Sequence, residues 1–356
     1  MEPRLVGIGT AVPEHTLDQA QSMDLASRLG AWREEDAAKL AGIYRRSTIA
    51  KRGSVLLGRE PGGNVGQEFF GEQSPTTARR FKRFEAEAPG LAARAARAAL
   101  ADGAVGAHEV THLIVVSCTG ASAPGVDAAL VGLLGLRGSV ERTFVGFMGC
   151  AGAISGLALA RSIAADGLSV VLVVSVELCS LHLQYSSEPQ QVVANALFAD
   201  GAAAAVVSAR GSGPRIAGRL CQLIPDSSDS MTWRVGDQGL RMTLSPRVPE
   251  IIARSLRGPL EAWLGERGLG IADVAGWVLH PGGPRVIEAV ESTLEVRRGS
   301  FEHSRGVLSE HGNMSSATVL FVYERVRAGA GSGGGGLPCV WLGFSPGLTV
   351  EALLLV

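Results

Sequence analysis

One cysteine stands where its thiol could act as a nucleophile. Cys150 lies in GFMGCAGAISGLALA, where an apolar strand ends, Gly149 turns the chain and a helix begins at or next to the cysteine. The partial positive charge at a helix N-terminus stabilises a thiolate, and a nearby imidazole would lower the thiol pKa further. Because a thiolate attacks acyl groups and a thioester keeps them activated, we expect Cys150 to carry an acyl intermediate. An inert buried thiol is the alternative, and we expect it for Cys118, Cys179, Cys221 and Cys339.

A histidine and an asparagine in the second half of the chain could complete the site. His280 lies in WVLHPGGPRVI, after an apolar strand and before a tight Pro-Gly-Gly turn. Sites of α/β proteins tend to lie at the carboxyl ends of strands, although a lone histidine can also be structural. Asn313 lies in SEHGNMSSATVLF at the start of a helix. Its amide could donate to a developing oxyanion, or the residue could be a plain helix N-cap.

Together, these three residue types support one catalytic cycle without a metal. Cys150 takes an acyl group from a thioester donor, while His280 and Asn313 donate hydrogen bonds to the thioester carbonyl of malonyl-CoA. Loss of carbon dioxide leaves an enolate with its negative charge on that oxygen, and the enolate carbon attacks the acyl-Cys thioester. Decarboxylation itself generates the carbanion, so no strong general base is needed. A papain-like protease also uses Cys, His and Asn, but its signature around the cysteine is missing.

Composition limits the classes of protein and partner. Of the 356 residues, 46% are hydrophobic and 19% are charged, with a formal net charge of -1, so we expect a folded protein without a nucleic-acid or membrane-surface partner. The five cysteines are far apart and form no CxxC pair, which argues against a disulfide scaffold and a zinc site. The start of the chain does not resemble a signal peptide, and no apolar run is long enough to span a membrane, so we expect a cytoplasmic location.

Strands and helices alternate along the chain, which predicts the α/β class. We expect a helix that begins at Ser74 as N-cap and breaks or kinks at Pro89. Three short apolar runs, 112–117, 142–147 and 169–176, have the character of buried strands. The other expected strands are 5–9, 277–279, 337–342 and 349–356, the expected helices are 284–294 and 313–326, and 328–336 is expected to be a flexible surface loop.

A similar spacing in the two halves suggests an internal duplication. Cys118 precedes Cys150 by 32 residues, and His280 precedes Asn313 by 33, in each case from a strand end to a helix start. Small residues follow both helix starts, so the two helices could approach closely. We therefore expect two halves, 1–210 with the cysteine and 211–356 with His280 and Asn313, whose catalytic residues converge at the interface.

The motifs resemble those of the chalcone synthase-like type III polyketide synthases over essentially the whole chain. GFMGCAGAISGL is similar to the nucleophile segment of that family, ALFADGAAAAVV to the gatekeeper segment, WVLHPGGPRVIE to the His segment, SEHGNMSSATVLFV to the Asn segment and GFSPGLTVE to the closing loop. The resemblance implies a thiolase fold with two similar βαβαβ-type halves in a layered α-β-α-β-α arrangement. It also implies a homodimer that uses acyl-CoA and malonyl-CoA, without a metal or organic cofactor.

The resemblance extends to residues that would contact the substrates. It makes Phe198 the gatekeeper, places Met242 where plant enzymes have a second gating Phe, and puts His182 and Trp233 in the cavity. Ala123 replaces a Met that plant enzymes insert into the partner subunit. Further substrate-contacting positions are Ser315, Gly343, Phe344, Pro346 and Gly347, and the basic residues expected to bind CoA are Lys39 and Arg46.

The product is less constrained by the motifs. ELCSLHLQ and GFMGC are most similar to bacterial alkylpyrone and alkylresorcinol synthases, so we expect a fatty acyl-CoA starter. One alternative is a tetrahydroxynaphthalene-type synthase that uses malonyl-CoA as its own starter. Another is a ketoacyl synthase III that performs a single condensation on a carrier protein, although NMSSA and GFSPGLT argue against it. The third is a silent thiolase-fold scaffold, against which the intact Cys150, His280 and Asn313 argue.

Overall fold

Two β-sheets form the framework of the protein. The structure is a computed structural model that describes residues 2–30, 36–56, 69–71, 73–329 and 336–356. The first sheet has the order β1-β7-β6-β4-β5, and β4 pairs in parallel with β5 and β6. Its strands are β1 (Arg4–Ala11), β7 (Asp200–Ser208), β6 (Val170–Leu178), β4 (His112–Ser117) and β5 (Glu141–Gly146).

The second sheet comes from the later part of the chain. Its order is β11-β12-β13-β8, with a parallel pair between β11 and β12. Its strands are β11 (Gly276–Leu279), β12 (Cys339–Ser345), β13 (Thr349–Leu355) and β8 (Ile216–Leu223). β12 and β13 are buried along most of their length, as their nearly continuous apolar sequences require.

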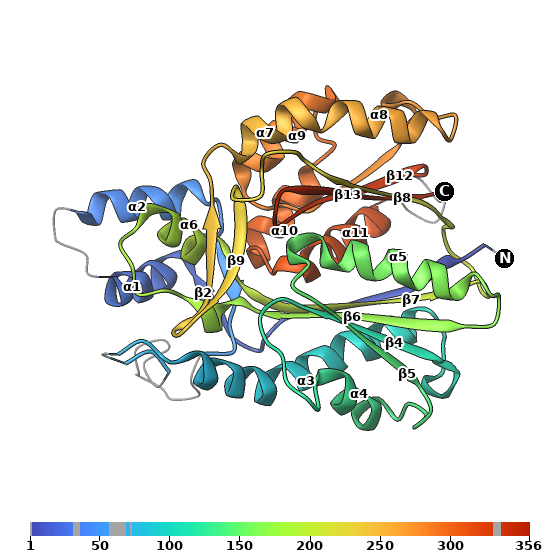
Figure 1. Cartoon of the computed structure of the whole chain (residues 1–356), viewed down its shortest axis with the longest axis horizontal. Coiled ribbons are helices and arrows are strands. Elements are labelled where there is room, and N and C mark those ends of the chain that lie inside the picture. Colours follow the sequence, from blue (N-terminus) through green and yellow to red (C-terminus); the bar gives the residue numbers. More distant parts are fainter. Residues whose placement is uncertain (1, 31–35, 57–68, 72, 330–335) are drawn as a thin grey trace.

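Helices separate and cover the two sheets, in five layers (Figure 1). α5 (Gly152–Ala164) and α11 (Thr318–Gly329) lie between the sheets and contact strands of both. α3 (Thr77–Asp102) and α4 (Val126–Leu134) cover the outer face of the first sheet. α7 (Val248–Ser255), α8 (Arg257–Gly265) and α9 (Pro284–Leu294) cover the second. The expected α-β-α-β-α layering is therefore confirmed.

The central helices α5 and α11 approach each other closely where they begin. A Cβ added at Gly152 would lie 3.3 Å from the Cβ of Ser316, and the hydroxyls of Ser175 and Ser316 are 2.6 Å apart. Only small side chains allow this approach, because a larger residue at either helix start would push the central layer apart. The close packing of the helix starts confirms the expectation drawn from the small residues after Cys150 and Asn313.

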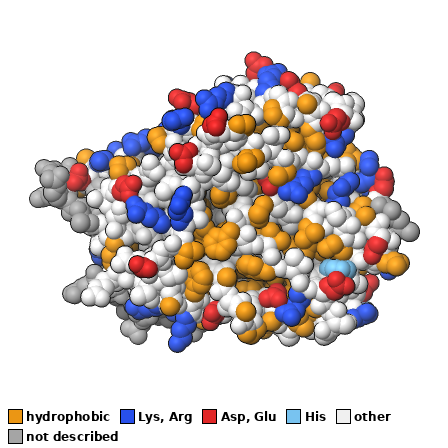
Figure 2. Space-filling view, in the orientation of Figure 1, with side chains coloured by type: hydrophobic (Ala, Val, Ile, Leu, Met, Phe, Trp, Pro, Cys, Tyr) orange, Lys and Arg blue, Asp and Glu red, His pale blue; other side chains and the backbone are white. Residues whose placement is uncertain are grey.

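Smaller elements gather at one end of the molecule, on the left in Figure 1 and, in the same orientation, in Figure 2. They are α1 (Gln19–Leu29), α2 (Ala37–Arg46), α6 (Pro189–Leu197), the two-stranded sheet of β2 (Thr16–Asp18) and β3 (Lys51–Gly53), and the hairpin of β9 (Met231–Gly236) and β10 (Gly239–Leu244). The short α10 (Glu302–His311) packs against α11 and β3. No helix in the described ranges is long and apolar enough to cross a membrane.

Some expectations about individual elements were wrong. α3 is capped by Thr76, not Ser74, and it continues through Pro89 as one helix of 26 residues. The strand at 142–147 is not buried: β5 lies at the edge of its sheet with most of its residues exposed. Asn313 lies two residues before the next turn of helix, which begins at Ser315. The loop expected at 328–336 falls largely outside the described residues.

Candidate active site

The nucleophile candidate lies in a tight turn between a strand and a helix. Cys150 is in the 3-10 turn η3 (Gly149–Ala151), which leads directly into α5, and its side chain is 7% exposed. Gly149 has φ of +68°, and a Cβ added there would lie only 2.1 Å from Cδ of Pro346. Glycine is needed at this position both for the positive φ and for the space. The GFSPG loop is therefore packed directly against the turn that presents Cys150.

Asn313 is fixed by its backbone as well as by its side chain. Its N–H donates to the carbonyl of Leu197 at 2.9 Å, and its carbonyl accepts from Ala199 at 2.9 Å, so it is paired with the segment that contains Phe198. Its Oδ1 accepts from the backbone N–H of Ser315 at 2.9 Å. This leaves Nδ2, which is 3.4 Å from the carbonyl of Gly282, as the donor available to a ligand.

Ser315 holds an uncommon backbone conformation beside the asparagine. Its φ is +47°, a region that residues other than glycine rarely adopt. The conformation directs its N–H to Asn313 and its side chain into the cavity beside Cys150. Strain of this kind persists only where the surrounding structure enforces it, and it is concentrated at functional sites.

His280 is buried without a hydrogen-bonding partner for its ring. It follows β11, its N–H donates to Leu342 at 2.8 Å, and its side chain is 1% exposed. Neither Nδ1 nor Nε2 has a partner among the described residues. Burial lowers the pKa of His280 to about 3, so the ring is neutral at physiological pH. A neutral imidazole carries one N–H that can donate to a bound ligand.

The expectation of a stabilised thiolate is wrong for this structure. Burial raises the pKa of the Cys150 thiol to about 12, the carboxylate of Glu177 adds to that shift, and the side chains of Ser315 and Asn313 oppose it. The position at the helix start does not overcome the cost of a charge in an apolar surrounding. Cys150 is therefore a neutral thiol, and a proton must leave it when it attacks an acyl group.

A small apolar cavity adjoins the thiol. Its lining includes Cys150 and the side chains of Phe198, Trp233 and Met242, together with Pro346 and Ser315. Phe198, Trp233 and Met242 also line a second void that contains His182, and Phe198 borders a third void beneath α1. The structure thus brings the predicted gatekeeper and cavity residues together around Cys150.

A large surface groove borders the two segments to which Asn313 bonds. It is lined by Arg46 on α2, by Leu197, and by Gly282, Gly283 and Arg285 in the segment after His280. Asn313 bonds to both Leu197 and Gly282, so it lies where the floor of the groove meets the cavity of Cys150. Arg285 was missed by sequence reasoning, although a basic residue directly after the Pro-Gly-Gly-Pro turn was a usable signal.

The remaining predicted site residues have different surroundings. Gly343 in β12 allows a close approach, since a Cβ there would lie 3.1 Å from Cβ of Ala151, and Phe344 beside it is buried. Gly347 has φ of +74° and donates to Met231, which joins the closing loop to the hairpin. Ala123 is exposed in the loop before α4 and is not part of the cavity wall. Lys39 is exposed on α2, one turn before a residue of the groove, but does not line it.

Two buried carboxylates near the site were not foreseen. Glu177 accepts from the backbone N–H of Cys118 and from the hydroxyls of Thr119 and Ser316, and burial raises its pKa. Asp200, two residues after Phe198, has its pKa raised to about 6 by burial. No motif marks either residue as buried, so sequence reasoning had no signal for them.

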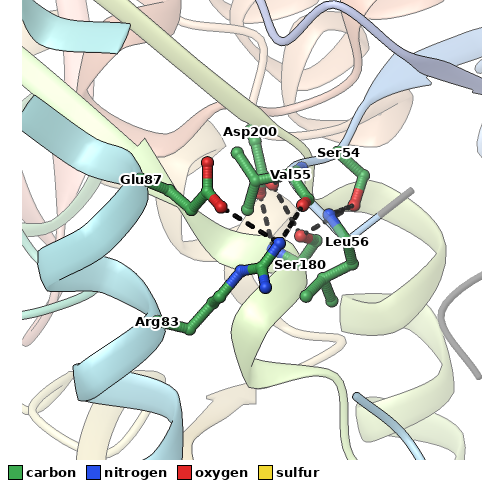
Figure 3. Close-up of polar contacts among 7 residues, drawn as sticks. All are labelled: Ser54, Val55, Leu56, Arg83, Glu87, Ser180 and Asp200. Atoms are coloured by element: carbon green, nitrogen blue, oxygen red, sulfur yellow. Dashed lines mark hydrogen bonds and ion pairs between the residues drawn. The ribbon is translucent and has the colours of Figure 1, made fainter. Parts of the chain in front are cut away.

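Asp200 connects two segments next to the gatekeeper. It accepts from the backbone N–H and hydroxyl of Ser180 at 2.7 and 2.6 Å and from the N–H of Val55 at 2.9 Å. Figure 3 shows these groups converging, with Arg83 donating to the carbonyl of Val55 from α3. The turn that carries His182 (η4, Cys179–His182) is thereby tied to the segment after β3.

Among the described residues, no cluster of three or more His, Cys, Asp or Glu side chains could hold a metal ion. The buried carboxylates are instead satisfied by backbone N–H groups and hydroxyls, which is the usual arrangement for a carboxylate inside a protein.

Known proteins share both the sequence and the fold. The chalcone and stilbene synthase family models match this chain, the N-terminal domain over residues 2–214 and the C-terminal domain over 216–356. The chain is 33% identical to the 1,3,6,8-tetrahydroxynaphthalene synthase of Streptomyces peucetius subsp. caesius, covering 99% of this chain and 92% of that protein. It is 31% identical to the alpha-pyrone synthesis polyketide synthase-like Pks18 of Mycobacterium tuberculosis, covering 98% and 89%.

Solved structures agree with these relatives. PKS-I from the brown alga Ectocarpus siliculosus superimposes with a TM-score of 0.93 at 31% identity, covering 99% of this chain and 98% of that one. The C-terminal type III polyketide synthase domain of Steely1 from Dictyostelium gives 0.90 at 27% identity, covering 100% and 99%. With the cysteine, histidine and asparagine placed as described, the chain belongs to the chalcone and stilbene synthase family and is a type III polyketide synthase.

Proposed function

We propose that this synthase loads a fatty acyl-CoA on Cys150 and extends it with malonyl-CoA in the cytoplasm. The Cys150 sulfur bonds to the acyl carbon, coenzyme A leaves, and the thiol proton passes to neutral His280 or to the departing thiolate. His280 and Asn313 then hold the thioester carbonyl of malonyl-CoA while carbon dioxide is lost. The resulting enolate carbon bonds to the acyl carbon on Cys150 and releases the sulfur for the next cycle.

The single observation that carries this proposal is the position of Asn313. Its backbone and side chain bond to Leu197 and Gly282, both in the wall of the groove, and its side chain lies close enough to Cys150 to lower the thiol pKa. A thioester carbonyl entering from the groove would therefore meet the Nδ2 donor just before it reaches the sulfur. One oxyanion donor of this kind is typically worth about 100- to 1000-fold in rate.

The groove suits a CoA thioester. Arg46 and Arg285 both line the groove, together with apolar residues such as Ile43, Val248 and Val286. Phosphates of CoA would pair with the arginines and the pantetheine arm would follow the apolar floor. Lys39 extends the basic face of α2 beyond the groove. The chemistry needs no metal or organic cofactor, because malonyl-CoA supplies the carbanion.

The starter assignment is supported by the cavity wall. Phe198 borders three small voids, one beside Cys150, one beside His182 and one beneath α1, and most of their lining is apolar. Met242 is unbranched and can change shape around an alkyl chain. Two or three extensions would give an alkylpyrone- or alkylresorcinol-type product. Malonyl-CoA as starter, giving tetrahydroxynaphthalene, is the second candidate, because one relative has that name.

A homodimer is supported by an exposed apolar edge. β5 is the edge strand of the first sheet, and Phe144 on it is 43% exposed, with Phe147 and Leu133 similarly exposed nearby. An uncovered apolar edge invites pairing with a second copy. Ala123 lies in the loop after β4, where it would face that copy.

The decisive experiment incubates the protein with acyl-CoAs from two to eighteen carbons and labelled malonyl-CoA. We expect a mass adduct on Cys150, absent from Cys150→Ala, and kcat/KM values that rise with chain length by a factor set by about 0.8 kcal/mol per buried methylene. A best rate with malonyl-CoA alone would favour tetrahydroxynaphthalene. A product only on a carrier protein would indicate ketoacyl synthase III chemistry, and no carbon dioxide release would indicate a silent scaffold.

A further inference from the structure

Two residues that line the cavity, Trp233 and Met242, come from a hairpin that belongs to neither main sheet. β9 and β10 form a two-stranded sheet of their own, in which Trp233 and Met242 are directly paired (Figure 1). An isolated two-stranded hairpin is marginally stable in water, so other elements must hold it in place. Because Trp233 and Met242 both face Cys150, any displacement of the hairpin changes the shape of the cavity.

The tip of the hairpin is held by Thr77 at the start of α3 and by Gln184, whose amide donates to the carbonyls of Gln238 and Leu240. The hydroxyl of Thr77 accepts from the N–H of Gly239 at 2.8 Å and donates to the carbonyl of Gly236. The N–H of Thr77, a first-turn donor with no partner inside its own helix, donates to the carbonyl of Asp237 at 2.9 Å. Thr77 therefore makes hydrogen bonds to three backbone groups of the turn.

The strands between the tip and the cavity have separate supports. The N–H of Leu240 donates to Nδ1 of His182 at 3.1 Å, and Gln191 donates to the carbonyl of Met242. Both His182 and Gln191 border the voids around Phe198, so changing them would also change the cavity itself. Thr77 borders none of these voids, and Gly239 is three residues, roughly 10 Å, from Met242 along the strand.

We propose that Thr77 is a positioning residue for starter and product selection, because it anchors the hairpin that carries Trp233 and Met242. The inference rests on the proposed function, since it concerns the cavity in which the acyl chain grows. It adds a determinant that does not touch the substrate and that acts through the tip of the hairpin. Loss of the hydroxyl removes two hydrogen bonds from the turn and leaves the side-chain volume unchanged in Thr77→Val.

A neighbouring threonine provides the matched control. Thr76 caps α3 by accepting from the N–H of Arg79 at 3.3 Å, and no hydrogen bond joins its side chain to the hairpin. Thr76→Val weakens the same helix start without touching the turn. Thr77→Ser keeps the hydroxyl and is the conservative rescue. The three variants separate an effect on the hairpin from an effect on the stability of α3.

The test combines hydrogen exchange with the acyl-CoA profile. In Thr77→Val we expect amide exchange of residues 236–242 to be about tenfold faster, as for the loss of one to two ordinary hydrogen bonds. We also expect at least a threefold change in the relative kcat/KM of short and long acyl-CoAs, with a changed product ratio. Thr76→Val and Thr77→Ser should keep both the wild-type exchange in this segment and the wild-type profile.

Three results would overturn the proposal. They are an unchanged profile in Thr77→Val, equal changes in Thr77→Val and Thr76→Val, and faster exchange without any change in products. Failure of the proposed function looks different, because the wild-type protein itself would then form no acyl adduct on Cys150, while the exchange measurement would still report on the hairpin anchor.

Discussion

Two histidines are buried in this protein to almost the same degree, yet their surroundings are opposite. His182 is 4% exposed and His280 is 1% exposed, and burial lowers the pKa of each to about 3. The ring of His182 is fully bonded: Nε2 lies 2.7 Å from the carbonyl of Thr119, and Nδ1 lies 3.1 Å from the N–H of Leu240. Neither ring nitrogen of His280 has a partner among the described residues.

The contrast separates a structural role from a ligand-binding role. His182 acts as a brace, because its ring hydrogen-bonds two segments together, whereas the ring of His280 is available to a ligand. Because Nδ1 of His182 accepts a backbone N–H, its proton must be on Nε2, and both nitrogens are already used. That ring joins the segment before the nucleophile turn to the hairpin and has nothing left to donate. The ring of His280 is held by its backbone alone, and its N–H remains free for a thioester oxygen. Burial and pKa are nearly equal, so bonding is what distinguishes the two roles.

The largest expected effect tests the free histidine. His280→Ala should lower carbon dioxide release from malonyl-CoA by about 100- to 1000-fold, because it removes one of the two oxyanion donors. Its free energy of unfolding should fall only by the cost of the cavity that replaces the buried ring, since no protein hydrogen bond is lost. Radiolabelled carbon dioxide release and urea unfolding measure the two quantities. A loss of less than tenfold would remove His280 from the oxyanion site.

The second effect is on stability and belongs to the brace. His182→Phe keeps a ring of similar size but leaves the N–H of Leu240 and the carbonyl of Thr119 without partners. Each buried group left unsatisfied costs about 1–3 kcal/mol, so we expect a loss of about 2 kcal/mol or more in the free energy of unfolding. Chemical denaturation with an unchanged m-value would measure it. A fully stable variant would show that the two hydrogen bonds are unimportant.

The sequence does not distinguish these two histidines, and it predicts the strands of the fold only in part. Continuous apolar runs such as 112–117 identified buried strands correctly, because period and burial agree there. The run 142–147 has the same character but lies at an exposed edge, since composition does not report the position of a strand in its sheet. The hairpin of β9 and β10 was not predicted, because its polar residues mask its strand pattern.

The candidate site was also predicted only in part from the sequence. The motifs singled out Cys150, His280 and Asn313. The structure places the side chain of Asn313 close to the thiol of Cys150, and the catalytic roles of the three residues stay predictions. The protonation state of Cys150 was predicted in the wrong direction, because a helix start is visible in a sequence and the burial that opposes it is not. Thr77 is marked by its tertiary contacts alone, so no spacing rule could have singled it out, whereas Arg285 directly follows a recognisable turn.

A third prediction concerns a property that the two histidines share. Between about pH 6.5 and pH 3 the unfolded chain binds a proton at each histidine and the folded protein does not, so stability is present above pH 6.5 and is lost as the pH falls. Each histidine contributes a slope of up to about 1.4 kcal/mol per pH unit. Both His182→Phe and His280→Ala should flatten the curve of unfolding free energy against pH.

The raised pKa of Asp200 acts with the opposite sign. It favours the protonated folded state from pH 6 down to about pH 3.8, and therefore adds stability as the pH falls. This contribution is common to the wild type and both variants, so it cancels in the difference between their curves. If neither variant flattened the curve, the histidines would be charged or exposed in the folded protein.

The smallest expected effect separates the contributions of the two hydrogen bonds made by the His182 ring. A glutamine at position 182 places its amide at the depth of Nε2 and can donate again to Thr119, whereas an asparagine places its amide at the depth of Nδ1 and can accept again from Leu240. Relative to His182→Phe, each variant should recover about 1 kcal/mol of stability, the usual net value of one hydrogen bond. Only His182→Asn should restore slow exchange at the amide of Leu240, because only that variant holds the hairpin. If His182→Gln protected the same amide equally well, the hairpin would be held through the packing of the side chain and not through the bond to Nδ1.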